Sequence, residues 1–305
     1  GDVYKRQMHN DTMTLVPRFL ALPDHPYPRI TAASVARKAG WVEKQLGPWR
    51  PDVIVCHTLW PAAILANRLA QRWSCPLVGV VHGYDFDVGL DLKGVGDRIR
   101  SAAACCDALV CASQRLADLV RDRGVNARRV ETIPCLTDVD REWRQPVRPM
   151  KKAWKKEPID ILFPADPRRP EKRHLLALQT GEVLEERGWV VGITTLRHQP
   201  RSIVFDRMLT ADVTLITSRR EAGPLVARES LMCGTPVVSV DVGEVGRYLP
   251  EEWVHEDDPE ALADGIEHAL RHGWQSEDTV DERLAFASFE AVSQAWTGLL
   301  SSLVS

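Results

Sequence analysis

The chain has 305 residues, of which 44% are hydrophobic and 27% charged, and its formal net charge is −3. These values are typical of a globular protein with one large domain or two ordinary ones, and they give no electrostatic reason to expect a nucleic-acid partner. The seven cysteines include no C-x-x-C pair, which argues against a zinc ribbon or redox motif and indicates reduced thiols in a cytoplasmic protein. No apolar run has the length of a transmembrane helix.

Residues 1–7 (GDVYKRQ) fit no start of an α/β domain, and we expect them to be non-native. A helix is expected first, and from residue 52 to 134 short apolar runs then alternate with segments of helical periodicity. The expected strands are 52–56, 76–81, 108–112 and 130–133, and the expected helices are 31–46, 62–73, 98–106 and 114–122. This alternation is typical of a parallel, doubly wound sheet, whose ligands bind beyond the carboxyl ends of the strands. His57 and His82 follow two of these strands.

Residues 141–158 interrupt the pattern with three prolines and the basic run KKAWKK, which we interpret as a solvated linker. Contact of this run with acidic lipid is the minor alternative. A second alternation follows, with strands expected at 159–163, 190–194, 213–216 and 237–240 and helices at 175–187, 259–271 and 289–304. We therefore predict a first domain over 1–145, a second over 146–288, and a terminal helix over 289–305 that packs back toward the first.

Two loops of the second domain carry candidate binding groups. Arg168, Arg169 and Lys172 follow one expected strand, and their cations suit a diphosphate. Glu221 precedes a short helix and Glu229 lies within it, so that two carboxylates can reach different parts of one ligand. Each feature also has a structural explanation: a solvated charged loop, a glutamate favoured by the helix dipole, or an exposed helix residue.

The sequence at 218–245 (SRREAGPLVARESLMCGTPVVSVDVGEV) resembles the Glu-x7-Glu block of the family 4 retaining glycosyltransferases. HTLWP at 57–61, HGYD at 82–85 and, more weakly, IPCLTDVD at 133–140 resemble other loops of that family. The resemblance implies an α/β protein of the GT-B fold, with two Rossmann-like, doubly wound domains facing a cleft. It also implies transfer of a sugar from a nucleotide-diphosphate sugar, with retention of anomeric configuration.

The resemblance also implies a role for each matching residue. Glu221, His82 and Lys172 would be catalytic, with Glu221 on the donor sugar, His82 near the transferred sugar and Lys172 on the leaving diphosphate. The remaining donor-binding residues would be Arg168 or Arg169 on the diphosphate, Glu229 on the ribose, and the backbone of Gly223, Pro224 and Leu225 on the sugar and phosphate. His57 is interpreted as structural. The family needs no metal or cofactor, and the donor would be UDP- or GDP-linked.

Several positions depart from the family pattern. Asp166 and Pro167 replace its usual glycine–arginine pair, and Arg173 replaces its usual glycine. The family's opening strand and glycine-rich loop find no counterpart, because the first 80 residues contain only four isolated glycines. We therefore expect a first domain that lacks both, in a chain truncated from a longer protein, with exposed sheet edges and poor activity.

The main functional hypothesis is thus a retaining glycosyltransferase. The alternatives are a catalytically inactive GT-B-like protein that binds a nucleotide or a partner and, less favoured, a GT-B epimerase or phosphorylase. The acceptor stays open between a glycan, a lipid and a small molecule, and the expected location is cytoplasmic, with peripheral contact at the inner membrane face left open.

Overall fold

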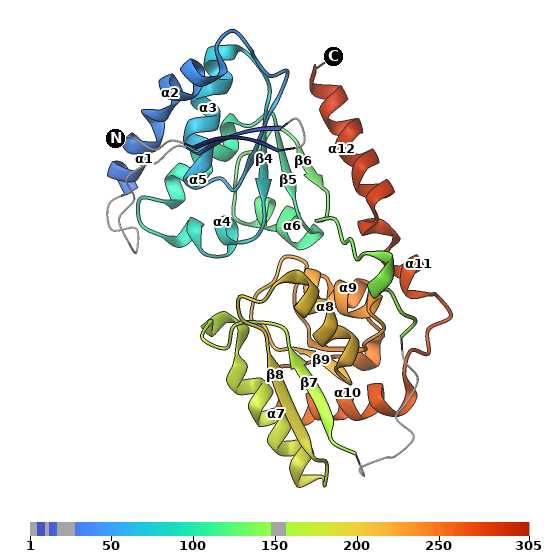
Figure 1. The fold of residues 1–305 in the computed structure, drawn as a ribbon. Helices are drawn as coiled ribbons and strands as arrows, with labels where there is room; N and C mark the ends of the chain where they lie inside the picture. The colour runs from blue at the N-terminus through green and yellow to red at the C-terminus, as the bar shows by residue number, and fades with distance from the viewer. Residues whose placement is uncertain (1–4, 10–11, 17–27, 148–156, 305) are drawn as a thin grey trace. The chain divides into compact units, whose positions relative to one another are not determined.

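The computed structural model describes residues 5–9, 12–16, 28–147 and 157–304, and the chain divides into two compact units (Figure 1). Unit 1 comprises Gly1–Ile133 together with Trp296–Ser305, and unit 2 comprises Pro134–Ala295. Residues 134–145, which the sequence analysis placed in the first domain, therefore lie in unit 2. The end of the terminal helix lies in unit 1, where Arg129 Nη1 donates a hydrogen bond to Ser302 Oγ at 2.8 Å. The basic run KKAWKK lies outside the described residues.

Unit 1 contains a parallel sheet in the order β3-β4-β5-β6. Its strands are β3 (Ile54–His57), β4 (Leu77–Val81), β5 (Ala108–Cys111) and β6 (Val130–Thr132). Its helices are α1 (Pro28–Ala36), α2 (Lys38–Leu46), α3 (Ala62–Trp73), α4 (Tyr84–Asp87), α5 (Gly96–Cys105) and α6 (Gln114–Asp122). An antiparallel hairpin of β1 (Lys5–His9) and β2 (Thr12–Val16) forms a separate sheet. The single helix predicted over 31–46 is two helices that meet at Arg37.

The four described parallel strands of unit 1 pair without interruption in the order β3-β4-β5-β6, so no gap separates them. All residues of β4 and β5 are buried, as expected for central strands of a parallel sheet. β3 and β6 are the two edge strands of the described sheet, and Val55 on β3 and Val130 on β6 are exposed.

Unit 2 contains a five-stranded parallel sheet in the order β11-β10-β9-β7-β8. Its strands are β7 (Ile159–Phe163), β8 (Val191–Thr195), β9 (Val213–Ile216), β10 (Val237–Val240) and β11 (Val254–His255). Its helices are α7 (His174–Glu186), α8 (Arg201–Thr210), α9 (Leu225–Met232), α10 (Pro259–His272) and α11 (Val280–Leu284), and α12 (Phe289–Val304) begins in this unit.

The chain reverses direction across the unit 2 sheet between β7 and β9. It passes from β7 outward to β8 and then returns to add β9, β10 and β11 on the other side. In doubly wound sheets this reversal separates the loops that follow the two neighbouring strands and opens a crevice for ligands at their carboxyl ends. The loop after β7 carries Lys172, and the loop after β9 carries Glu221.

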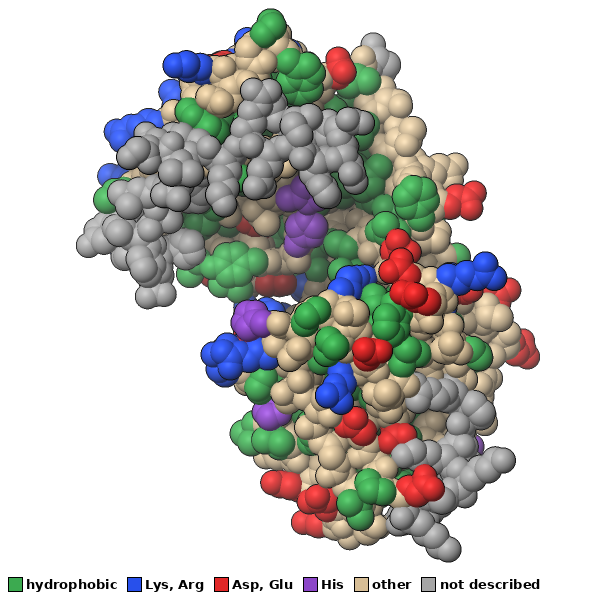
Figure 2. Space-filling view, viewed as in Figure 1, with side chains coloured by type: hydrophobic (Ala, Val, Ile, Leu, Met, Phe, Trp, Pro, Cys, Tyr) green, Lys and Arg blue, Asp and Glu red, His purple; other side chains and the backbone are tan. Residues whose placement is uncertain are grey.

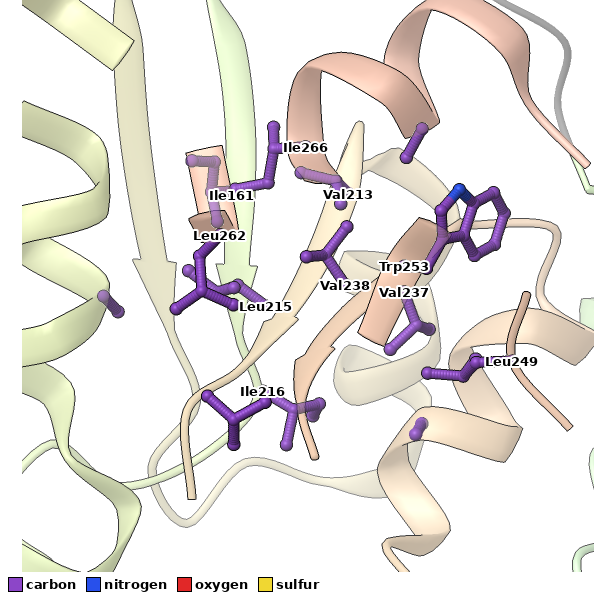
Figure 3. Packing of buried hydrophobic residues seen from close by; sticks show 14 of the residues in the cluster. Ile161, Val213, Leu215, Ile216, Val237, Val238, Leu249, Trp253, Leu262 and Ile266 are labelled. Carbon is purple, nitrogen blue, oxygen red and sulfur yellow. The ribbon is translucent and has the colours of Figure 1, made fainter. Parts of the chain in front are cut away.

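Both faces of the unit 2 sheet are buried, which explains why its strands are continuous apolar runs. Ile161 on β7 packs with Leu262 and Ile266 of α10 in the main core, as Figure 3 shows. Leu162 points to the other face and packs with Phe205 and Met208 of α8. Helix α10 is capped at its start, since Asp258 Oδ2 accepts a hydrogen bond from the amide of Ala261 at 2.9 Å.

Candidate functional site

Hydrogen bonds to backbone carbonyl oxygens join the loop after β7 to the loop after β9. The Thr217 hydroxyl donates to the carbonyl oxygens of Lys172 at 2.8 Å and Arg173 at 3.1 Å. The amide of Arg219 donates to the carbonyl of Glu171 at 2.9 Å. These bonds fix the backbone on both sides of the β7–β9 reversal, and they bring the cationic loop and the Glu-x7-Glu block of the sequence analysis together.

The backbone at Arg173 has a conformation that favours glycine. Its φ of +52° lies in the left-handed region, which is unfavourable for a residue with a side chain. Contacts of the guanidinium offset this cost: Nε donates to the Thr217 carbonyl at 2.5 Å, and Nη2 donates to Asp257 at 2.7 Å. The substitution therefore keeps the turn that presents Lys172.

Lys172 and Glu221 form an ion pair at the reversal. Their side chains are only 15% and 16% exposed, so the pair is shielded from water but still reachable. A shielded pair of opposite charge is a suitable receptor for a ligand that carries both an anionic group and hydroxyl groups, because each member can exchange its partner for one part of the ligand. The structure thus brings together two of the three predicted catalytic residues.

Glu229 on α9 is 7% exposed, which excludes its interpretation as an exposed helix residue. Its carboxylate accepts an ion-pair contact from Arg201 Nη2 of α8 at 2.9 Å. Arg201 also lies over the ring of Phe205, with its Cζ 4.7 Å from the ring centroid. Helix α8 was not predicted from the sequence, because the segment 201–210 shows no clear amphipathic period. The contact of Arg201 with Glu229 was not predicted either, because the two residues are far apart in sequence.

Arg168 and Arg169 contact acidic neighbours within their own loop. Arg168 Nη2 donates to Asp166 at 2.7 Å, and Arg169 Nε donates to Glu171 at 2.7 Å. The hydrogen bond from Arg168 holds the pKa of the Asp166 carboxyl well below its usual range. Arg168 and Arg169 are 60% and 58% exposed, so they are available to a ligand only in competition with these carboxylates and with water. Their assignment to the diphosphate stays a prediction.

Gly223, Pro224 and Leu225 lead into α9, which begins at Leu225 and has no side-chain cap at Pro224. Amides at an uncapped helix start are available to an anion or a hydroxyl group. A side chain at Gly223 would collide with Glu244, because an added Cβ would lie 2.8 Å from Glu244 Oε1. Glu244, which was not singled out from the sequence, would therefore have to move to admit a side chain at Gly223.

His57 and His82 lie at the carboxyl ends of the neighbouring strands β3 and β4 in unit 1. His57 Nδ1 and His82 Nε2 are 3.0 Å apart, and the rings stack with centroids 5.3 Å apart. Burial, and then the neighbouring His57, lower the pKa of His82. Asp85 fastens the two loops, because its carboxylate accepts hydrogen bonds from the amides of Leu59 at 2.9 Å and Trp60 at 3.0 Å. His57 is thus a direct partner of His82.

Two families match this chain. Residues 5–141 match Glycosyltransferase Family 4, and residues 184–283 match Glycosyl transferases group 1. A D-inositol 3-phosphate glycosyltransferase from Thermobispora bispora is 32% identical over 99 residues, which cover 25% of this chain and 23% of that relative. The aligned part thus spans less than a quarter of the relative's length.

Solved structures resemble almost the whole chain. A sucrose-phosphate synthase from Thermosynechococcus elongatus has a TM-score of 0.69 at 19% identity, with 97% of this chain and 84% of that one covered. HepE from Anabaena in complex with UDP has a TM-score of 0.63 at 16% identity, with 91% and 85% covered. The same protein in complex with UDP-glucose has a TM-score of 0.61 at 17% identity, with 87% and 82% covered.

The chain has a family 4-like glycosyltransferase domain and a group 1 glycosyltransferase domain on a GT-B fold. The predicted α/β fold class is therefore confirmed. The first match begins at residue 5, within the segment 1–7 that the sequence analysis set aside. The second match includes Glu221 and Glu229, whereas Lys172 lies before its first residue.

Two further properties of this GT-B chain bear on its chemistry. Within the ranges given above, no cluster of His, Cys, Asp or Glu side chains is arranged to hold a metal ion, and no helix is long and apolar enough to cross a membrane. On the face seen in Figure 2, acidic and basic side chains of unit 2 are interspersed.

Proposed function

We propose that this chain transfers a sugar from a UDP- or GDP-linked donor to an acceptor hydroxyl, with retention of anomeric configuration. The observation that carries the proposal is the shielded Lys172–Glu221 pair at the β7–β9 reversal, with Glu229 on the helix that follows. The binding of UDP and UDP-glucose by a protein of the same fold supports a nucleotide-sugar donor.

In this proposal the donor separates the Lys172–Glu221 pair. Glu221 accepts hydrogen bonds from hydroxyls of the donor sugar, while Lys172 contacts the diphosphate. The bond between the anomeric carbon and the diphosphate oxygen breaks, and the diphosphate leaves with the bonding electrons. Lys172 stabilises the negative charge that develops on it. The acceptor oxygen bonds to the anomeric carbon on the same face, and its proton passes to the departing diphosphate.

Glu229 and the uncapped start of α9 complete the donor site in this proposal. The Glu229 carboxylate is held by Arg201, and it binds the ribose hydroxyls of the nucleotide. The amides of Gly223 and Leu225 bind the sugar and phosphate oxygens. Arg168 or Arg169 adds a cation to the diphosphate. In unit 1, His82 takes part in the transfer step.

Thermal shift against UDP-, GDP- and ADP-sugars tests the donor part of the proposal, because a ligand that binds only the folded state raises the unfolding temperature. Donor hydrolysis, in which water replaces the acceptor, tests turnover, and NMR of the released sugar reports its anomeric configuration. We expect a shift with one UDP- or GDP-sugar, release of the retained anomer, and loss of release in Glu221→Ala with the thermal shift kept. No shift with any donor, or an inverted product, would contradict the proposal.

A further inference from the structure

Two loops of unit 2 meet through a pair of glycines. The loop after β9 carries Glu221 and Gly223, and the turn after β10 carries Gly243 and Glu244. An added Cβ at Gly243 would lie 3.1 Å from the carbonyl oxygens of both Glu221 and Ala222, and φ at Gly243 is +65°. An added Cβ at Gly223 would lie 2.8 Å from Glu244 Oε1. Each loop thus approaches the other where it has no side chain, so the turn after β10 forms a support for the Glu221 loop.

Glu244 is the side chain at the centre of this contact. It is 8% exposed, and its Oε1 atom is buried without a hydrogen-bond partner among the described residues. Burial raises the pKa of this carboxyl, while Arg228 and Arg247 oppose the shift. The nearest nitrogen of Arg247 is 3.9 Å from Glu244 Oε2. A buried carboxylate with so few close donors is unfavourable unless a charge nearby compensates for it.

Arg228 supplies such a charge. It lies on α9 directly before Glu229, it is completely buried, and its Nε atom also lacks a partner among the described residues. Its Nη1 donates to the carbonyl of Cys135 at 3.3 Å, and its Cζ lies 5.8 Å from the ring centroid of Phe286. Arg228 is thus a buried cation on the helix that carries Glu229, and its charge opposes the rise in the Glu244 pKa that burial causes.

We propose that Glu244 is a positioning residue that fixes the loop carrying Glu221 and Gly223 in the geometry that binds the donor sugar. This inference rests on the proposed function and extends it to residues that contact no donor. Glu244 acts on the loop through its close approach to Gly223, and the buried charge of Arg228 partly compensates for the burial of the Glu244 carboxylate.

The contact itself is tested by a double-mutant cycle at Gly223 and Glu244. Gly223→Ala adds the methyl group that meets the carboxylate, and we expect it to raise the donor KM between about 10- and 100-fold by displacing the loop. Glu244→Asp withdraws the carboxylate by one methylene group. The double variant should bind donor more than about threefold better than the two single effects combined predict. Gly246→Ala is the matched control, since nothing lies within 4 Å of an added Cβ there.

The role of the charge is tested by Glu244→Gln, which keeps the shape of the side chain. We expect a rise in donor KM with a smaller change in kcat, and partial recovery in Glu244→Gln with Arg228→Met, because that variant leaves no single charge buried. Unchanged KM and kcat in Glu244→Gln, or strictly additive effects in the Gly223 cycle, would overturn the inference.

Hydrogen exchange tests the support role of Glu244 independently of the donor role of the site. Amides of residues 219–225 should exchange faster in Glu244→Gln than in wild type, while those of α7 stay unchanged. This measurement requires no turnover. Faster exchange in a protein that binds no nucleotide sugar would keep the support role and reject the donor role. Unchanged exchange in a protein that binds donor would reject the support role alone.

Discussion

His57 Nδ1 lies 3.0 Å from His82 Nε2, within hydrogen-bond distance, so one ring can donate a proton that the other accepts. Both rings cannot be protonated in this arrangement, because two N–H groups would then face each other. The contact ties the HTLWP and HGYD loops together at their histidines, and Asp85 ties them again through the amides of Leu59 and Trp60. The two loops that the sequence analysis considered separately are thus one assembly.

This contact predicts a pH-dependent stability. Burial and His57 lower the pKa of His82 from its usual 6.5. Between the lowered value and 6.5, the unfolded chain binds a proton that the folded chain does not, so the free energy of unfolding falls as the pH drops through this window. Urea unfolding at about pH 7.5 and about pH 5.5 measures this loss. In His82→Gln, which cannot titrate at this position, the loss should be smaller.

NMR titration of the imidazole nitrogens supplies the companion measurement. We expect His57→Asn to raise the pKa of His82, because it removes the neighbouring charge while burial remains. His198→Asn, in unit 2, is the matched control and should leave the His82 titration unchanged. A His82 pKa that does not respond to His57→Asn would contradict the coupling of the two rings.

Asp85 predicts a stability effect in unit 1 that requires no assumption about function. Asn has one acceptor oxygen in place of two, so Asp85→Asn should leave one of the amides of Leu59 and Trp60 without its bond. The expected loss is about 1–3 kcal/mol in the free energy of unfolding, measured in urea. Asp122→Asn, on the exposed end of α6, should change it by less than about 0.5 kcal/mol. If the two substitutions changed the free energy of unfolding equally, the hydrogen bonds accepted by Asp85 would not stabilise unit 1.

The sequence predicted those elements whose local pattern agrees with their environment. β7, β9 and β10 are apolar runs bounded by turn residues, and their predicted and observed limits coincide. Ser113 and Asp258 begin helices α6 and α10 as caps, with hydrogen bonds to the amides of Leu116 and Ala261. Burial on both sheet faces and helix capping are local effects, which is why a single sequence shows them.

The candidate site was predictable only in part, because its contacts join residues far apart in sequence. The family resemblance indicated Lys172 and Glu221, but neither spacing nor periodicity shows that they form an ion pair. Arg201 was not predicted because its helix has a weak amphipathic pattern, and its partner Glu229 lies on another element. Glu244 was not singled out from the sequence, and only the fold shows that it lies against Gly223 with its Oε1 atom buried.

Glu229 predicts a specific loss of nucleotide affinity. Glu229→Ala removes a carboxylate that is 7% exposed and leaves Arg201 without this partner. If Glu229 binds the ribose, the variant should bind the nucleoside diphosphate and the nucleotide sugar equally more weakly, by about 10-fold or more, the effect of losing a charged hydrogen bond. Calorimetric titration with both ligands measures this. Glu182→Ala, on the exposed face of α7, is the control and should keep wild-type affinity.

Lys172 and Glu221 allow stability and activity to be separated in one set of variants. Lys172→Met and Glu221→Gln each leave one shielded charge unpaired, so each should lower the free energy of unfolding, whereas the double variant should recover part of it. Transfer should behave differently. Lys172→Met should reduce kcat by about 100- to 1,000-fold through loss of charge stabilisation at the leaving diphosphate, and the double variant should not recover it.

The stability and turnover of these single and double variants together decide whether the ion pair is structural or catalytic. If the pair serves only to hold the two loops together, activity should follow stability and return in the double variant. If the pair is the donor receptor, stability returns while turnover stays lost, because a ligand cannot exchange with partners that are no longer present. Lys93→Met, at an exposed lysine of unit 1, controls for the loss of a positive charge and should change neither property.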